Sequence, residues 1–248
     1  MKKLLLYGCL FAICVGAGCK KGNKTLKTYL LKQQITDNTG AGGSIDTANY
    51  AYDDQYRPVN VSDFSGQGKV TFTLTYDSQN RVSTAKKTGS NGNLIIEYDF
   101  FYQGDAAGYY LYGSTHVADT ANFVFNEKHQ VIDITTKHSG HTTFAYDTRG
   151  NVASTQIYAT DGLNQLTNED DYAYDTKKNP FSQMTPASNL FIQYILFINN
   201  PSTLINNVAS KNGEPYLYTY NTDGYPLSVV ITLYNHNLVK EYYSYIVK

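Results

Sequence analysis

The sequence contains no tryptophan, and its three cysteines all lie within the first 19 residues. Charged residues make up only 17% of the chain, and the formal net charge is −1. A nucleic-acid-binding protein would normally carry a basic patch, so this charge balance argues against nucleic acid as a partner. Because no cysteine follows Cys19, the rest of the chain has no thiol and no disulfide, and its core and hydrogen bonds must hold it together.

Tyrosine is abundant, with 24 tyrosines and 11 phenylalanines in 248 residues. Tyrosine at this level suits half-buried β-strands, where the ring packs and the hydroxyl reaches water. The chain is too rich in aromatic and β-branched residues to be disordered. Its length permits one large β domain or two small ones, and we predict a single domain over residues 28–248.

The first 19 residues have the pattern of a targeting segment. Lys2 and Lys3 precede an apolar run over residues 4–18, which is shorter than the ~20 residues that a membrane span needs. The run ends in Val15-Gly-Ala-Gly-Cys19, which resembles the lipobox of bacterial lipoproteins. That resemblance implies a signal peptide over 1–18, a lipid on Cys19 and a tether over 19–27. Gly16 departs from the usual aliphatic residue, and simple secretion with cleavage after a nearby small residue is the alternative.

A repeat follows, in which two aromatic residues at alternate positions precede Asp or Asn. It first occurs at Tyr50-Ala-Tyr52-Asp53, and the second aromatic falls at positions 52, 76, 125, 146, 174 and 220. Two of the gaps are about twice the others. We therefore expect degenerate units at Tyr98-Asp99 and near Phe197, which gives eight units at a mean spacing of about 24 residues.

The local pattern within a unit is that of a β-strand. Val70, Phe72, Leu74 and Tyr76 alternate with three threonines, so one face of the strand is apolar. A unit of this length holds two strands and two turns. The sequence therefore predicts an all-β fold, an antiparallel meander of about 14–16 strands. An open sheet this wide is rare, so it should curl or close into a barrel-like sheet.

The acid or amide after each aromatic pair is predicted to start a type I turn, because its side chain can accept backbone N–H groups two residues on. Three residues further on, a residue in the left-handed conformation would complete a hairpin with a bulge. Gly150 and Gly224 suit that conformation best. The turn initiators are Asp53, Asp77, Asn126, Asp147, Asp175 and Asn221.

The repeat is interrupted after Asn179-Pro180-Phe181, because proline cannot continue a strand ladder. The apolar spacing that follows favours one short helix near residues 186–197, which would plug or cap the sheet. A continuous buried strand is the alternative. If the protein has a localised function, we expect it between Asn179 and Asn200.

The motif Tyr146-Asp-Thr-Arg-Gly-Asn-Val152 resembles the YD repeat of RHS-type proteins. The whole set is similar to a family of Bacteroidota lipoproteins of unknown function. The matching segments are Lys178-Asn-Pro-Phe181, Asn199-Asn-Pro201 and Tyr218-Thr-Tyr-Asn-Thr-Asp-Gly-Tyr-Pro226. The resemblance implies a curled, porin-like sheet in a water-soluble, lipid-anchored protein, and it brings no catalytic residues. Lys20 and Lys21 differ from the acidic residues that often follow the cysteine in surface-exported members, which favours the periplasmic side of the outer membrane.

Three clusters of side chains could in principle carry chemistry. His138 and His141 flank a turn, but no further ligand lies nearby, so we predict no metal site. The acidic run Glu169–Asp171 lacks the spacing of a calcium loop. Carboxylates of the repeat could act as paired acids on a glycan, but their role in turns already explains them.

The sequence therefore predicts a lipid-anchored, non-catalytic binding or scaffold module with no cofactor. Its expected partners are the membrane through the lipid, and a glycan, peptidoglycan or an envelope protein. The alternatives are a carbohydrate-active hydrolase with a tyrosine-lined groove and a pore-forming outer-membrane barrel.

Overall fold

The computed structural model describes residues 27–65, 68–103, 106–113, 117–138, 140–159, 165–183, 205–233 and 235–248. These residues form 16 β-strands and one turn of 3₁₀ helix, η1, at Thr39–Ala41. The strands are β1 Tyr29–Asp37, β2 Ile45–Tyr52, β3 Pro58–Ser65, β4 Gly68–Tyr76, β5 Val82–Thr88, β6 Leu94–Gln103, β7 Ala106–Tyr112, β8 Val117–Phe125, β9 Val131–Thr136, β10 Gly140–Tyr146, β11 Val152–Tyr158, β12 Leu166–Lys178, β13 Asn206–Lys211, β14 Glu214–Tyr220, β15 Pro226–Thr232 and β16 Leu238–Val247.

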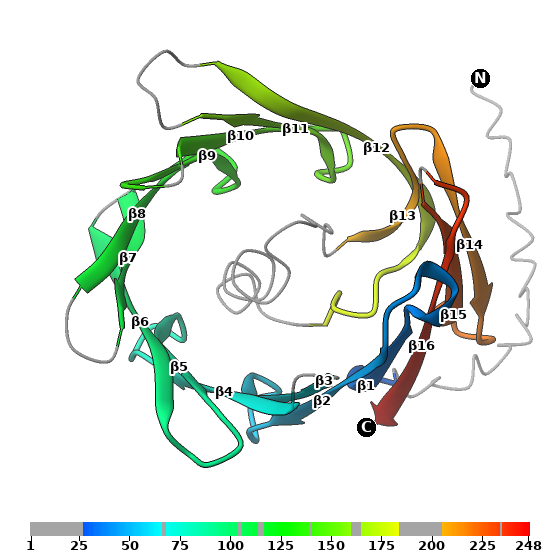
Figure 1. The fold of residues 1–248 in the computed structure, drawn as a ribbon, viewed down its shortest axis with the longest axis horizontal. Helices are drawn as coiled ribbons and strands as arrows, with labels where there is room; N and C mark the ends of the chain where they lie inside the picture. Colours follow the sequence, from blue (N-terminus) through cyan, green and yellow to red (C-terminus); the bar gives the residue numbers. More distant parts are fainter. Residues whose placement is uncertain are drawn as a thin grey trace, which may run out of the picture.

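The strands form a closed antiparallel barrel in which neighbours in sequence are neighbours in the sheet (Figure 1). Closure is made by the first and last strands, with Tyr29 opposite Val247 and Asp37 opposite Lys240. This confirms the predicted meander at the upper end of its strand count, and the sheet is closed rather than only curled. Closure leaves no strand edge exposed, which removes the association hazard of an open sheet.

Aromatic residues line the inner face of the wall, and the exposure of successive residues alternates accordingly. In β4, Phe72 and Leu74 are buried, whereas Thr73 and Thr75 are exposed. The same alternation occurs in β14, where tyrosines at 216, 218 and 220 are more protected than the residues between them. The main core cluster follows the inner wall from β1 to β10, and its fully buried members include Phe123 at 2% exposure.

A ladder of tyrosine hydroxyl groups explains why tyrosine recurs at most of the second aromatic positions, with Phe125 as the exception. Each hydroxyl donates to a main-chain carbonyl on a nearby part of the wall, at 2.5 to 2.9 Å. The pairs are Tyr52 to Leu31, Tyr76 to Pro58, Tyr102 to Val82, Tyr146 to Val131, Tyr174 to Val152 and Tyr245 to Pro226. The ring therefore packs inside the wall while its hydroxyl satisfies a backbone acceptor.

This ladder corrects the assignment of the degenerate units. Tyr102, rather than Tyr98, makes the bond of the repeat, and Asp99 lies in the middle of β6 facing outward opposite Tyr110. In its described part, the second long gap contains one hairpin, formed by β13 and β14, and β12 pairs directly with β13. Phe197 and the predicted helix over 186–197 lie outside the described residues.

Tyr146→Phe tests the ladder. It removes the 2.7 Å hydrogen bond to the Val131 carbonyl, and we expect it to lower the free energy of unfolding by about 1 kcal/mol. Urea denaturation measures the change. Tyr110→Phe is the matched control, because that ring is on the outer face and 43% exposed, and its effect should stay within about 0.5 kcal/mol. Equal effects for the two variants would show that the ladder contributes nothing.

Candidate functional site

The turns at one rim of the barrel share a single geometry. In five of them, one side-chain oxygen of Asp or Asn accepts the backbone N–H groups two and four residues on, at 2.8 to 3.0 Å. The residue three positions on has a positive φ, as at Asn80 and Gly150. The turn initiators with this geometry are Asp53, Asp77, Asn126, Asp147 and Asn221. These side chains hold backbone, so they are positioned for structure rather than for chemistry.

Asp175 departs from this geometry because its turn is split. Its carboxylate accepts the N–H of Lys177, as expected. The N–H of Asn179, four residues on, donates to the Ile205 carbonyl and not to Asp175. Instead the backbone N–H and side-chain amide of Asn207, 32 residues on, both donate to it at 3.2 Å. The Tyr220 hydroxyl also donates to this carboxylate, whereas the other tyrosines of the ladder donate to main-chain carbonyls. The residues between Lys178 and Asn207 are therefore an insertion into a turn of the repeat.

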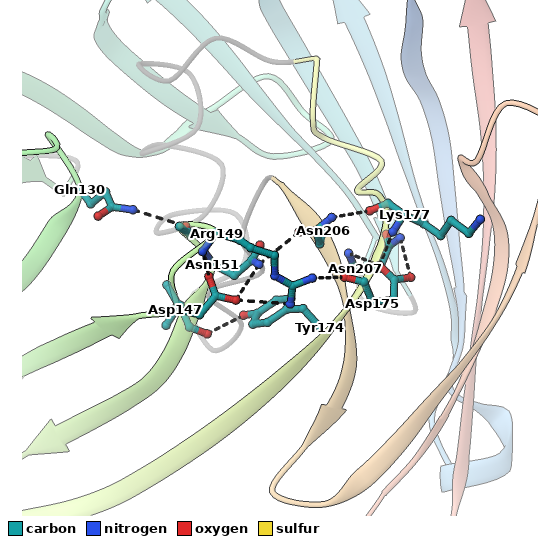
Figure 2. Close-up of polar contacts among 11 residues, drawn as sticks. Gln130, Asp147, Arg149, Asn151, Tyr174, Asp175, Lys177, Asn206 and Asn207 are labelled. Atoms are coloured by element: carbon teal, nitrogen blue, oxygen red, sulfur yellow. Dashed lines mark hydrogen bonds and ion pairs between the residues drawn. The ribbon is translucent and has the colours of Figure 1, made fainter.

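The insertion is joined to the adjacent turn by amide groups (Figure 2). Asn151 donates to Asp147 at 2.9 Å and to the Asn206 side chain at 3.2 Å. Asn206 donates onward to the Lys177 carbonyl at 3.0 Å. Arg149 reaches across from its own turn to the Asp175 carbonyl at 2.8 Å. These contacts fix the point where β13 re-enters the sheet.

Below the split turn, the insertion's first residues and the inner wall enclose a cavity of about 60 Å³. Phe181, just after β12, is buried in the main core and meets the ring of Tyr50 edge-on at 5.9 Å. The cavity combines aromatic rings with amide and carboxyl groups, the mixture typical of a small-ligand site. Its lining residues are Gln34, Asn179, Pro180, Phe181, Asn207, Val208, Tyr216, Tyr218, Ile231, Glu241 and Tyr243.

Glu241 supplies the carboxylate of this cavity. It lies on the less exposed face of β16, the same face as Tyr243 and Tyr245. Tyr243 donates its hydroxyl to the Glu241 carboxylate. Gln34 also bonds Glu241 and accepts the Tyr50 hydroxyl at 3.4 Å. Burial raises the pKa of Glu241, and the hydrogen bonds from Tyr243 and Gln34 oppose that rise in part.

The other sequence candidates make contacts within the wall of the barrel. His141 stacks on the ring of Tyr158 at 4.3 Å, and within the described ranges no three His, Cys, Asp or Glu side chains are placed to hold a metal ion. The acidic run divides between the two faces of the wall. Asp170 pairs with Lys211 at 3.0 Å, whereas Glu169 accepts from Gln156 at 2.7 Å.

Sequence reasoning missed Glu241 and Asn207. The signal for Glu241 was present, because an acid occupies an inward position of a strand whose other inward residues are apolar or tyrosine. The signal for Asn207 is that Asn207-Val208 repeats Asn151-Val152 after an interruption. A function between Asn179 and Asn200 stays a prediction: residues 179–181 line the cavity, and residues 184–204 lie outside the described part.

The turn carboxylates should make stability depend on acid. Although burial alone would raise the pKa of Asp77, hydrogen bonds and charge from Arg81 outweigh it and lower that pKa. Ionised Asp77 therefore stabilises the fold above the unfolded-state pKa of about 4, and this contribution is lost as pH falls through the lower folded-state pKa.

Asp77→Asn should keep the turn, since Asn126 and Asn221 hold the same geometry, and remove part of the acid sensitivity. The difference in melting temperature between wild type and variant is expected to shrink from pH 6 towards about pH 2. Thermal unfolding across this range measures it. The control is Asp54→Asn, because Asp54 is an exposed carboxylate in the preceding turn of the repeat. A constant difference across the range would rule out this role for Asp77.

No protein-family model matches the chain, and no curated protein matches it. Among solved structures, a porin-like protein from Bacteroides vulgatus is similar at 9% identity, over 88% of this chain and 99% of that chain, with a TM-score of 0.43. A porin-like protein from Bacteroides uniformis is similar at 12% identity, over 87% and 96% of the two chains, with a TM-score of 0.39. The Photorhabdus luminescens Tc holotoxin pore is similar over 75% of this chain but 12% of its own, at 13% identity and a TM-score of 0.24. These scores are low, so the class of the fold, a closed 16-stranded antiparallel barrel, rests on the chain's own strand pairing.

Proposed function

We propose that this protein is a lipid-anchored, non-catalytic binding or scaffold module of the cell envelope, whose barrel stands in water on the periplasmic side of the outer membrane. The observation that carries the proposal is the orientation of the wall. Most aromatic side chains of the repeat face inward, while the exposed outer positions of β4 and β16 include Thr73, Thr75, Lys240 and Ser244 beside one aromatic residue, Tyr242. A membrane-spanning barrel has the reverse pattern, with an apolar outer band and a polar interior.

A charged pair in the outer wall supports the same orientation. Lys86 of β5 lies opposite Glu97 of β6, and their charged groups are 2.9 Å apart. Their neighbours Ala85 and Tyr98 are buried, so the ion pair faces outward. A lysine on the lipid-facing side costs about 2–4 kcal/mol at the midplane of a bilayer, whereas in water the pair costs little.

Anchoring is attributed to Cys19, which lies outside the described residues together with the rest of segment 1–26. None of the helices in the described part of the chain is long and apolar enough to cross a membrane. The aromatic inner wall and the polar cavity supply the surfaces for a ligand. A hydrolase of the paired-acid type would need two facing carboxylates, and Glu241 is the single carboxylate among the cavity's described residues.

Cell fractionation with a palmitate label tests this assignment. Wild-type protein should be labelled and recovered with membranes, whereas Cys19→Ala should lose the label and move to the soluble fraction. Tyr110→Phe serves as a control that leaves Cys19 intact. Membrane retention of Cys19→Ala after a salt wash would contradict the proposal and favour a barrel that itself inserts in the bilayer.

A further inference from the structure

The carboxylate of Glu241 lacks a cationic partner among the described residues. None of the ion pairs formed by those residues includes it. Two neutral donors, Tyr243 and Gln34, occupy part of its accepting capacity. An ionised carboxylate offers about four lone-pair sites, so room remains for a further donor from the cavity side.

A second group lining the cavity is an acceptor without a donor. Asn207 is fully buried, and its side-chain oxygen, Oδ1, has no hydrogen-bond partner within the described part of the chain. Its amide nitrogen is engaged, donating to Asp175 and to the Lys178 carbonyl at 3.2 and 3.0 Å. A buried carbonyl oxygen left unpaired costs about 1–3 kcal/mol, and a ligand with N–H groups would relieve that cost.

The remaining walls present aromatic rings. Tyr216, Tyr218 and Tyr243 line the cavity from β14 and β16, and Tyr218 is held in place by stacking on Tyr220 at 5.7 Å. Ring faces carry partial negative charge and attract an ammonium group. Burial raises the pKa of Glu241, which shows that its negative charge is poorly solvated and would gain from a bound cation.

We propose that this cavity binds the protonated amino group of an organic amine. Glu241 supplies the charge, Asn207 Oδ1 accepts an N–H, and the rings of Tyr216 and Tyr218 surround the ammonium group. The volume of about 60 Å³ suits an ammonium group with a few methylenes and is too small for a disaccharide. A neutral hydroxylated ligand would also need donors from the protein, and Tyr243 already donates to Glu241. The inference rests on the proposed function as a binding module and specifies its ligand class.

Calorimetric titration of the purified full-length protein with putrescine tests the inference. We expect putrescine to bind and butanediol, its neutral counterpart of equal length, to give no heat. Glu241→Gln should weaken putrescine binding at least about tenfold, because a buried charge pair is lost. Glu169→Gln, the same change on the outer wall, should leave binding unchanged. Tyr218→Phe should retain binding, whereas Tyr218→Leu should weaken it.

The outcomes separate this inference from the proposed function. Thermal unfolding of each variant establishes that it is folded, and loss of an unpaired charge in Glu241→Gln should not lower the melting temperature. Equal binding of butanediol or glucose, unchanged affinity in Glu241→Gln, or no binding of putrescine to folded protein would each overturn the amine site. A protein that remains palmitate-labelled and dependent on Cys19 for membrane recovery would still satisfy the proposed function in all three cases.

A second experiment, in which the charge of the amine is removed by acetylation, distinguishes a cell-wall amine from a free one. Purified peptidoglycan sacculi are incubated with the protein before and after acetylation of their free amino groups. Capture that is lost on acetylation and competed by putrescine indicates the cell-wall peptide as the amine, and binding of putrescine without capture indicates a free diffusible amine. Capture that survives acetylation, and that Glu241→Gln leaves unchanged, would contradict the proposed recognition.

Discussion

Deleting residues 179–206 together with Lys178→Gly is expected to leave a folded, closed barrel. The deletion joins the start of the Asp175 turn directly to Asn207. The residues between Asp175 and Val208 then become Thr-Lys-Gly-Asn, against Thr-Arg-Gly-Asn between Asp147 and Val152. Asn207 already occupies the place in the Asp175 turn that Asn151 occupies in its own. The insertion is therefore separable from the hairpin that carries it.

The energetic terms of this deletion oppose one another. Loss of buried Phe181 costs about 1.5–3 kcal/mol. Shortening the connection from 31 to 3 residues returns about 2 kcal/mol of loop-closure entropy. We therefore expect cooperative unfolding with a free energy close to that of the wild type, and complete loss of putrescine binding because the cavity loses one wall.

The same deletion with Lys178 retained is the matched control. The turn geometry requires a positive φ at this position, as in Gly150 at 90°, so retaining the lysine should cost about 1 kcal/mol. Circular dichroism and urea denaturation report both fold and stability. If neither deletion variant folds, the insertion is an integral part of the barrel and the split-turn interpretation is wrong.

Phe123→Ala is expected to destabilise the barrel strongly. Phe123 lies on the inner face of β8, is 2% exposed, and its ring is 6.0 Å from that of Tyr109. Truncating a buried phenylalanine removes its transfer free energy and leaves a cavity, a combined loss of about 3–5 kcal/mol. In a barrel of this size, that corresponds to a fall in melting temperature of about 10 °C.

Its neighbour supplies the control. Val124 faces outward and is 50% exposed, so Val124→Ala should change stability by less than about 0.5 kcal/mol. Differential scanning calorimetry compares the two variants. Equal effects at adjacent positions would mean that the two faces of β8 are not distinguished by burial, and that the inward orientation of the aromatic side chains is incorrect.

The features of the fold that the sequence predicted are those encoded within a few residues. Alternation in Val70–Tyr76 and the Asp-to-glycine geometry of the 147–151 turn both depend on neighbours in sequence, so local physics determines them. Closure depends on β1 meeting β16 across the whole length of the chain, and no local pattern encodes that pairing. It was therefore predicted only through the general cost of open edges.

Tyr98 shows where periodicity failed. Positions 98, 100 and 102 all face inward, so a period of two cannot say which aromatic ends the unit. The prediction took Tyr98 because Asp99 follows it, but Asp99 is an outward residue of β6. The hydrogen bond from the Tyr102 hydroxyl to the Val82 carbonyl identifies Tyr102 as the aromatic residue that ends the unit. This contact joins residues 20 positions apart in sequence.

The candidate site could be predicted only in its location. The break after Asn179 points to the region where the cavity lies, because proline and a lost repeat are local signals, and a function there stays a prediction. The lining residues within strands come from β1 and from β13 to β16, and closure of the sheet is what brings β1 beside β16. The hydrogen bonds between Asp175 and Asn207 join residues on either side of the insertion, so the regular spacing of the repeat does not predict them.

Cysteine accessibility tests the central claim, that the wall is aromatic inside and water-exposed outside. The chain has no cysteine after Cys19, so single cysteines can be placed at adjacent positions of β4 in the full-length protein. In isolated, opened membranes, Thr73→Cys should react rapidly with a water-soluble maleimide, while Leu74→Cys should react only after unfolding. Protection of Thr73→Cys together with quenching of a fluorophore at that position by lipid-borne quenchers would contradict the account and place the outer wall in the bilayer.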